Sequence, residues 1–245
     1  MLKKICLNGG LLPTQEVKVP ITLKQYVKEI QFFINKGILN FHIHFRDSYG
    51  NESLDENIIY TQFRFLKDKF PMINIGIGSP LQNGINSKLR EELISNWYNF
   101  KPDFISVNLS EKGSLDLINI LKEKDIKIEY GIFSLKDAEI FTNNKLYINC
   151  YRVLLEIIDD NNNPKTSAKA IKEANNLVNY FQQLYPDIEI ILHGENKYDW
   201  DIIKIAIEKN INYRIGLEDT TIDGKGRILE SNIQLYNYYR FFINQ

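Results

Sequence analysis

Short runs of apolar, often β-branched residues alternate with amphipathic segments along the whole chain, and this alternation is what most limits the fold. The runs that predict strands are residues 4–7, 38–45, 73–77, 104–107, 126–130, 147–157, 188–192 and 213–217. Each is followed by a segment that can form a helix. Repeated strand–helix units build a parallel sheet, and eight of them predict a TIM (β/α)8 barrel. The alternative is an open doubly wound sheet, in which the eighth strand would not pair with the first.

Start and stop signals agree with this division of the chain. Thr22 is a typical N-cap for the first amphipathic segment, and the long segment after the sixth strand stops before Pro186. The polar run 159–163 predicts a loop between the sixth strand and its helix rather than a linker. The chain is therefore predicted to be one domain over residues 1–245.

The charge balance argues against two classes of partner. The formal net charge is -1 at pH 7, which gives no field to attract nucleic acid or an anionic membrane surface. No apolar run approaches the ~20 residues of a membrane span, and residues 5–7 are too short for the core of a signal peptide. A cytoplasmic location is expected. Cys6 and Cys150 are expected to be buried thiols rather than a disulfide.

Two of the three histidines lie two positions apart on the second predicted strand, in the sequence FHIHFRD. Side chains two apart on a strand point to the same face. His42 and His44 are therefore expected to project together near the C-terminal end of the strand, where barrel enzymes hold their active sites. This pattern indicates a metal site with two imidazole ligands. The alternative is a pair of core histidines with hydrogen-bond partners nearby.

The eighth predicted strand runs directly into two carboxylates, Glu218 and Asp219. In a closed barrel this strand lies beside the first, with the second strand next, so Glu218 is expected near the histidine pair. Two imidazoles and one carboxylate leave a zinc position open for substrate, as in catalytic sites. Arg214 is expected to point inward from the same strand. The alternatives are that the carboxylates begin a solvated loop, or that Arg214 and Asp219 form a structural ion pair.

Several segments together resemble the β-keto acid cleavage enzyme family. They are LNGG (7–10), FHIHFRDSYG (41–50), SVN (106–108), LHGE (192–195) with Trp200, and RIGLEDT (214–220) followed by Gly226 and Asn232. The similarity spans nearly the whole chain. It implies a zinc-dependent TIM barrel that reacts a β-keto acid with acetyl-CoA or a related acyl-CoA, giving acetoacetyl-CoA and the acyl-CoA of the remaining fragment. It also implies a homo-oligomer, often a tetramer.

The resemblance also implies roles for particular residues. The positions that match the family's zinc ligands are His42, His44 and Glu218. Asp219 matches the base, and Arg214 matches its partner near the reacting carbonyl. Ser106 and Asn108 fall where the family binds substrate. The CoA thioester is implied by the resemblance alone, because no glycine motif that would cradle its phosphates is recognisable in the sequence.

Two positions depart from the family's better-known aminohexanoate-cleaving members. Leu11 stands where those members have a glutamate that binds the substrate ammonium, so a cationic substrate is not expected. The sequence from Gly76 to Ser79 stands where they have a serine followed by threonine and two glycines, so the family's polar contact there is moved or lost, and Ser79 is the candidate substrate contact in this segment. Substrate specificity is therefore expected to differ, and the chain is closer to the family's compact branches.

Other polar residues at predicted strand ends are secondary candidates. Glu129 and Glu195 are interpreted as inward carboxylates at the C-terminal rim, which either contact substrate or brace the arginine of the eighth strand. His193 is expected to support the site or to contact substrate rather than to be a fourth metal ligand, because a fourth ligand would close the catalytic position. Arg46 is expected to pair with Asp47, with a substrate carboxylate as the alternative partner.

Two other functions are left open by the sequence. A metal-dependent barrel hydrolase of the amidohydrolase kind also has a His-x-His strand motif, but it usually adds further histidines and an aspartate ligand on strand eight. This chain has three histidines in all. A non-catalytic barrel that binds a small acid is the other alternative. The retained ligand types together with Asp219 favour the enzyme.

Overall fold

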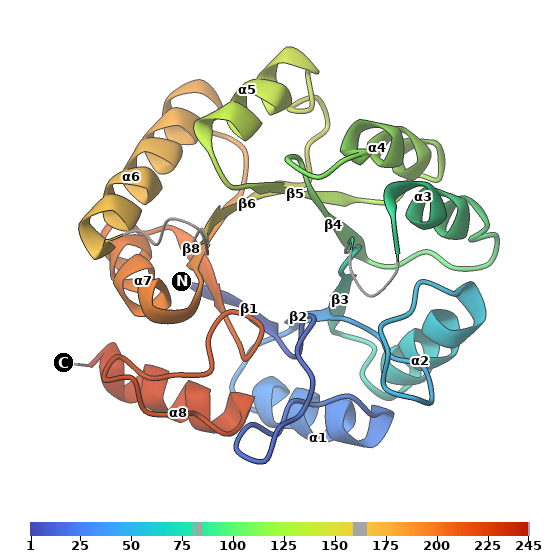
Figure 1. Ribbon diagram of the computed structural model, residues 1–245, viewed down its shortest axis with the longest axis horizontal. Coiled ribbons are helices and arrows are strands. Elements are labelled where there is room, and N and C mark those ends of the chain that lie inside the picture. Colours follow the sequence, from blue (N-terminus) through green and yellow to red (C-terminus); the bar gives the residue numbers. More distant parts are fainter. Residues whose placement is uncertain (80, 82–84, 159–165, 245) are drawn as a thin grey trace.

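Figure 1 shows a computed structural model of the chain as a ring of strands enclosed by helices. The structure describes residues 1–79, 81, 85–158 and 166–244. The strands are β1 (Leu2–Cys6), β2 (Asn40–Ile43), β3 (Asn74–Ile77), β4 (Phe104–Asn108), β5 (Ile128–Ile132), β6 (Arg152–Ile157), β7 (Ile190–Gly194) and β8 (Asn212–Ile215). They form a closed parallel barrel in sequence order, and Ile215 of β8 pairs with Ile5 of β1. The TIM-barrel prediction is confirmed and the open sheet is excluded.

Helices cover the outside of this barrel (Figure 1). They are α1 (Leu23–Ile34), α2 (Glu56–Lys69), α3 (Ser87–Ser95), α4 (Ser114–Glu123), α5 (Leu135–Asn143), α6 (Ser167–Leu184), the short 3-10 helix η1 (Asn196–Tyr198), α7 (Asp199–Glu208) and α8 (Asn232–Phe242). Thr22 caps α1 as predicted, in a reciprocal capping box with Gln25. None of the described helices is long and apolar enough to cross a membrane.

The core lies between the outer face of the barrel and the helices, as strand alternation requires. Strand β6 illustrates this division. Val153, Leu155 and Ile157 belong to the apolar cluster that includes the helix faces. Arg152 and Glu156, on the alternate positions, are buried polar residues of the barrel interior. The barrel interior therefore carries charges, and these charges position the site.

The main error in the predicted boundaries concerns the sixth strand, which was expected over residues 147–157. Strand β6 begins only at Arg152. Asn149 has a φ of 56°, in the left-handed region that asparagine tolerates and strands do not contain. The loop predicted at 159–163 lies outside the described residues. Cys6 is buried, Cys150 is partly buried, and both are free thiols as predicted.

A buried ion cluster lies inside the barrel, away from the C-terminal ends of the strands, and it includes Glu129. This residue is the second of β5, well below the C-terminal rim, and its carboxylate pairs with Lys4 of β1 and Arg152 of β6. All three side chains are fully buried. Burial alone would raise the pKa of Glu129, but the two cations lower it well below its usual value. The glutamate is therefore held by the barrel itself rather than presented to a substrate.

Asn232, the first residue of α8, connects the two ends of the chain. Its side chain donates to the carbonyl of Leu7 (2.8 Å) and to Glu29 Oε2 (2.7 Å), and it accepts from the backbone N–H of Leu217 (2.7 Å). Leu7 and Leu217 follow β1 and β8, so this one amide holds the segments that lead into the site. Burial raises the pKa of Glu29 to about 7.

Glu29→Gln is expected to stabilise the protein in a pH-dependent way. The pKa of Glu29 is raised from 4.5 to about 7 by folding, so the stability that the protonated group contributes is fully present below pH 4.5 and is lost as pH rises through 7. Glutamine keeps an acceptor for Asn232 without the buried charge. In urea unfolding, the free energy of unfolding of the variant minus that of the wild type should rise between pH 4.5 and 8, by on the order of 3 kcal/mol. A gain that is the same at every pH would contradict this explanation.

Candidate functional site

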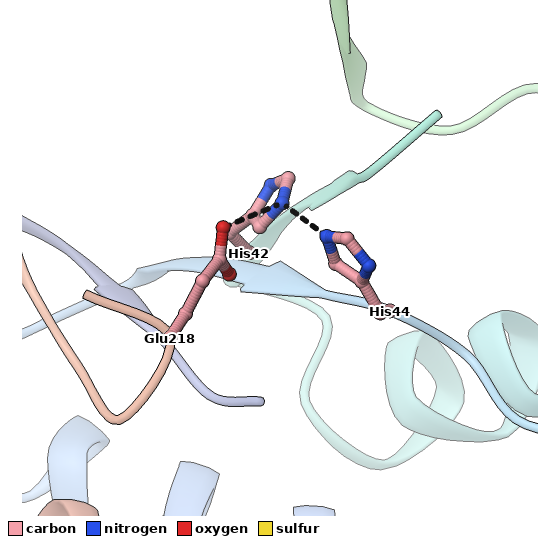
Figure 2. Close-up of side chains that lie close together, drawn as sticks. All are labelled: His42, His44 and Glu218. Carbon is pink, nitrogen blue, oxygen red and sulfur yellow. Dashed lines mark hydrogen bonds and ion pairs between the residues drawn. The ribbon is translucent and has the colours of Figure 1, made fainter. Parts of the chain in front are cut away.

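His42 of β2, His44 just beyond the end of β2 and Glu218 after β8 meet at the C-terminal mouth of the barrel (Figure 2). His42 Nε2 lies 3.1 Å from His44 Nε2 and 3.6 Å from Glu218 Oε1. The ligand atoms of the three residues all lie within 4.8 Å of one another. Burial lowers the pKa of His42 well below its usual value, which keeps its imidazole neutral and its nitrogen lone pair available. The structure thus brings together the three residues that the sequence singled out.

These three residues fit a tetrahedral metal ion. Bonds of about 2.0–2.2 Å to such an ion place neighbouring ligand atoms roughly 3.3–3.6 Å apart, close to the 3.1 and 3.6 Å separations around His42 Nε2. Glu218 Oε2 is buried and has no hydrogen-bond partner among the described residues. A buried carboxylate oxygen without a partner is costly unless a cation balances it. Two imidazoles and a carboxylate are a donor set typical of zinc.

Two glycines leave the room that the ligands occupy. A Cβ on Gly78, just after β3, would overlap the imidazole of His44, with its Cδ2 atom only 2.8 Å away. A Cβ on Gly9 would lie 2.5 Å from Glu218 Cγ, and Gly9 has a φ of +51°. Both positions therefore favour glycine for steric reasons. The LNGG and GIGS segments contribute space to the candidate metal centre rather than ligands.

Arg214 and Asp219 form a buried pair beside the candidate ligands. Both Arg214 Nη2 (2.7 Å) and Nε (3.1 Å) donate to Asp219 Oδ1, and Nη2 also lies 3.2 Å from Glu218 Oε1. Asp219 Oδ2 has no hydrogen-bond partner among the described residues. Burial raises the pKa of Asp219 although the guanidinium opposes this. The carboxylates do not begin a solvated loop, and the ion pair expected as an alternative is present within the cavity wall.

His193 supports this pair, together with a glutamate that the sequence reasoning missed. His193 Nε2 lies 3.0 Å from Glu156 Oε2, and His193 Nδ1 lies 3.3 Å from Asp219 Oδ1. Burial lowers the pKa of His193 to about 3 and raises that of Glu156 to about 7. A charged residue at an inward position of the apolar run VLLEI was the available sequence signal for Glu156. His193 is not part of the cluster of candidate metal ligands among the described residues.

The ligands and the ion pair line one cavity of about 500 Å³. Of the expected substrate contacts, the residues that line it are Ser79, Ser106, Asn108 and Glu195. Ser79 Oγ donates to the carbonyl of Ser106 (2.6 Å), and Asn108 Nδ2 donates to Glu111 Oε1 (3.0 Å). Leu11 also lines the cavity, whereas Glu129 is not among its lining residues. The cavity lining therefore combines several carboxylates with apolar side chains such as Leu11.

Arg46 does not make the contact predicted for it. Its guanidinium donates to the carbonyls of Gly9 and Leu11 and lies 3.8 Å from Glu52 Oε1. Asp47 instead accepts from backbone N–H groups of its own turn. The predicted Arg46–Asp47 pair is therefore wrong, because the chain turns back after Asp47 and brings Glu52 to the guanidinium. Arg46 is also absent from the residues that line the described cavity.

The fold and the site define a TIM barrel with a candidate His–His–Glu metal centre at the C-terminal mouth of the barrel. Residues 4–240 match the family model described as beta-keto acid cleavage enzyme. The chain belongs to this family. A search of curated proteins finds no match.

Solved structures share the fold at low sequence identity. The binary complex of ObcA with oxaloacetate has a TM-score of 0.69 at 14% identity, over 91% of this chain and 63% of that one. The ternary complex of ObcA with a C4-CoA adduct and oxalate gives 0.69 at 13% identity, over 92% and 64%. A type I 3-dehydroquinate dehydratase from Clostridium difficile gives 0.65 at 10% identity, over 100% and 93%. The chain thus spans less than two thirds of the ObcA chains, and these likenesses show the fold alone.

Proposed function

We propose that this chain is a zinc-dependent acyltransferase that exchanges acyl groups between a β-keto acid and acetyl-CoA or a related acyl-CoA. The observation that carries the proposal is the convergence of His42, His44 and Glu218 beside the Arg214–Asp219 pair in one cavity. Membership of the β-keto acid cleavage enzyme family supports it. The CoA thioester as co-substrate is supported by the family and by the C4-CoA adduct of the ObcA complex.

The atom balance of this exchange fixes its products. One CoA group enters with acetyl-CoA, so one CoA group leaves. The C2–C3 bond of R–CO–CH2–COO⁻ and the thioester C–S bond break, while C2 bonds to the acetyl carbonyl carbon and the CoA sulfur bonds to the R–CO carbon. The products are acetoacetate and R–CO–SCoA. The product pair expected from the sequence, acetoacetyl-CoA with a second acyl-CoA, would need two CoA groups and therefore cannot form from one acetyl-CoA.

His42, His44 and Glu218 would hold the zinc ion, which when bound polarises the keto oxygen and stabilises negative charge there. Asp219 takes the proton from C2 of the keto acid as general base and returns it to C2 of acetoacetate after the C2–C3 bond breaks. Its Oδ1 is held by two Arg214 nitrogens, so Oδ2, which has no partner among the described residues, is the oxygen left to accept the proton. His193 is neutral because its pKa is lowered to about 3, and it braces Asp219 without adding charge.

The cavity suggests where the substrate is selected. Its volume of about 500 Å³ lies within the range of small-molecule sites, enough for the keto acid and the thioester end of the acyl-CoA. Leu11 presents an apolar side chain to the cavity, so the proposed substrate carries no ammonium group at this position. Ser106 and Asn108 on β4, and Ser79 and Glu195, offer the polar contacts. The active form is proposed to be a homo-oligomer, which light scattering can test.

The decisive experiment incubates the zinc-loaded protein with acetyl-CoA and a panel of β-keto acids, and follows acetoacetate and the new acyl-CoA by mass spectrometry. His44→Ala and Asp219→Asn are the matched variants for the metal centre and the base. Both products should form with the wild type and be lost in each variant. Zinc binding without products from any keto acid would overturn the proposal in favour of a hydrolase or a small-acid-binding barrel.

A further inference from the structure

The chain makes a tight hairpin shortly after β2, and this hairpin places the carboxylate of Glu52 beside the proposed metal centre. Arg46 and Glu52 form an antiparallel bridge. The backbone N–H of Asp47 donates to the carbonyl of Asn51 (2.8 Å), and Asp47 Oδ1 accepts from the backbone N–H of Asn51 (2.9 Å). Gly50 has a φ of +87°, which suits glycine in such a turn. The sequence from 46 to 52 is therefore built to bring residue 52 back beside β2.

The Glu52 carboxylate lies within hydrogen-bond distance of Nδ1 of the His44 imidazole, the ring nitrogen that does not face His42. Glu52 Oε1 lies 2.6 Å from His44 Nδ1, and the two side chains are only 4% and 9% exposed. A carboxylate accepts this hydrogen bond only if Nδ1 carries the proton. Nε2 of the neutral ring is then unprotonated, and it is the nitrogen that faces His42 and Glu218 (Figure 2). The hydrogen bond thus selects the tautomer in which His44 can bind a metal ion.

Arg46 forms an ion pair with the same carboxylate oxygen of Glu52. Its Nη2 lies 3.8 Å from Glu52 Oε1 and also donates to the carbonyls of Gly9 and Leu11. The Glu52 charge is therefore balanced in its buried position. Gly9 is the residue that makes room for Glu218. The same guanidinium thus connects the carboxylate behind one candidate ligand to the loop beside another.

His42 lacks a comparable support. Its Nδ1 is buried and has no hydrogen-bond partner among the described residues. The orientation of His42 is set by its place within β2 and by packing. His44 lies one residue beyond the end of β2, and there the side chain of Asn8 accepts from its backbone N–H and donates to its carbonyl, at 2.9 Å each. Asn8 thus holds the backbone of His44, and Glu52 is the partner of its imidazole ring.

We propose that Glu52 is a positioning residue of the metal centre, which fixes the His44 tautomer and ring orientation and increases the basicity of its Nε2. The inference rests on the proposed zinc site. Loss of such an outer partner typically lowers metal affinity by about 10- to 100-fold. Glu52 does not line the main cavity, so its effect reaches the substrate only through the metal ligand.

The test measures zinc affinity by competition with a chromophoric chelator. Glu52→Ala is expected to weaken zinc binding about 10- to 100-fold, and Glu52→Asp, which retracts the carboxylate but keeps its charge, about 10-fold. Glu52→Gln keeps an acceptor oxygen and should lose less zinc affinity than Glu52→Ala. Asp47→Asn is the matched control in the same hairpin and should bind zinc as the wild type does, because asparagine forms the same turn. Wild-type affinity in Glu52→Ala and Glu52→Asp would overturn the inference.

A second readout reports the tautomer directly. With three histidines in the chain, long-range ¹H–¹⁵N spectra of the metal-free protein can resolve each ring. His44 should be protonated at Nδ1 in the wild type and Glu52→Gln, and should become a tautomer mixture in Glu52→Ala with the other two rings unchanged. An unchanged His44 tautomer would contradict the proposed role. Wild-type zinc affinity in His44→Ala would contradict the proposed metal centre itself. Wild-type zinc affinity in the Glu52 variants, with affinity lost in His44→Ala, would contradict this inference alone.

Discussion

Asp219→Asn is expected to lower kcat for the proposed acyl exchange by about 10²- to 10⁴-fold, the usual contribution of a general base. Asparagine has nearly the same shape and keeps an oxygen for Arg214, but it cannot take the proton from C2. Zinc affinity should change little, because Asp219 is not one of the grouped ligands. Steady-state rates at saturating acetyl-CoA, with zinc content measured on the same samples, check both statements.

Asp223→Asn is the matched control for this variant. Asp223 lies four residues further on and its Oδ2 accepts from Arg227 Nε at 2.7 Å, and it is not among the residues that line the cavity. Its substitution should leave kcat within about twofold, because asparagine keeps the Oδ1 atom that accepts from the backbone N–H groups of Lys225 and Arg227. Wild-type kcat in Asp219→Asn would show that another group removes the proton, and Glu156 would then be the next residue to test.

Glu129→Ala is expected to destabilise the protein by about 3–5 kcal/mol, because it leaves two buried cations without their carboxylate. Lys4 and Arg152 are both fully buried and both pair with Glu129. The free energy of unfolding from urea titrations, monitored by circular dichroism, measures this loss. A substrate-binding role would instead raise KM and leave stability unchanged.

Glu189→Ala provides the comparison for an ion pair near the surface. Glu189 Oε1 lies 2.9 Å from Lys3 Nζ, and the two side chains are 28% and 37% exposed. Its removal should cost no more than about 1 kcal/mol. The double variant Lys4→Met/Glu129→Leu should recover part of the stability lost in Glu129→Ala, since it removes a charge of each sign together. If Glu129→Ala and Glu189→Ala lowered the free energy of unfolding equally, the buried ion cluster would not be the cause of the loss.

The fold and the group of three candidate metal ligands could be predicted from the sequence because they depend on regular periods. Strand alternation placed His42 and His44 on one face, and closure of the barrel brought Glu218 from the far end of the chain to them. The polar contacts around them were less accessible. Glu129 was expected at the rim, but its level in the strand depends on where β5 starts, and strand boundaries follow from packing and register more than from composition.

The local pattern of the sequence determined the βα repeat, the barrel and the faces on which the chemical groups lie, because periods of 2.0 and 3.6 residues are properties of the backbone. The tertiary structure alone decided the partners of those groups. A hairpin places Glu52 beside His44, and the pairing of β6 with β7 places Glu156 beside His193. Arg46 pairs with Glu52 and not with its neighbour in the chain, Asp47. Such contacts depend on side-chain direction and register between segments, to within an ångström or so, and no local period encodes them.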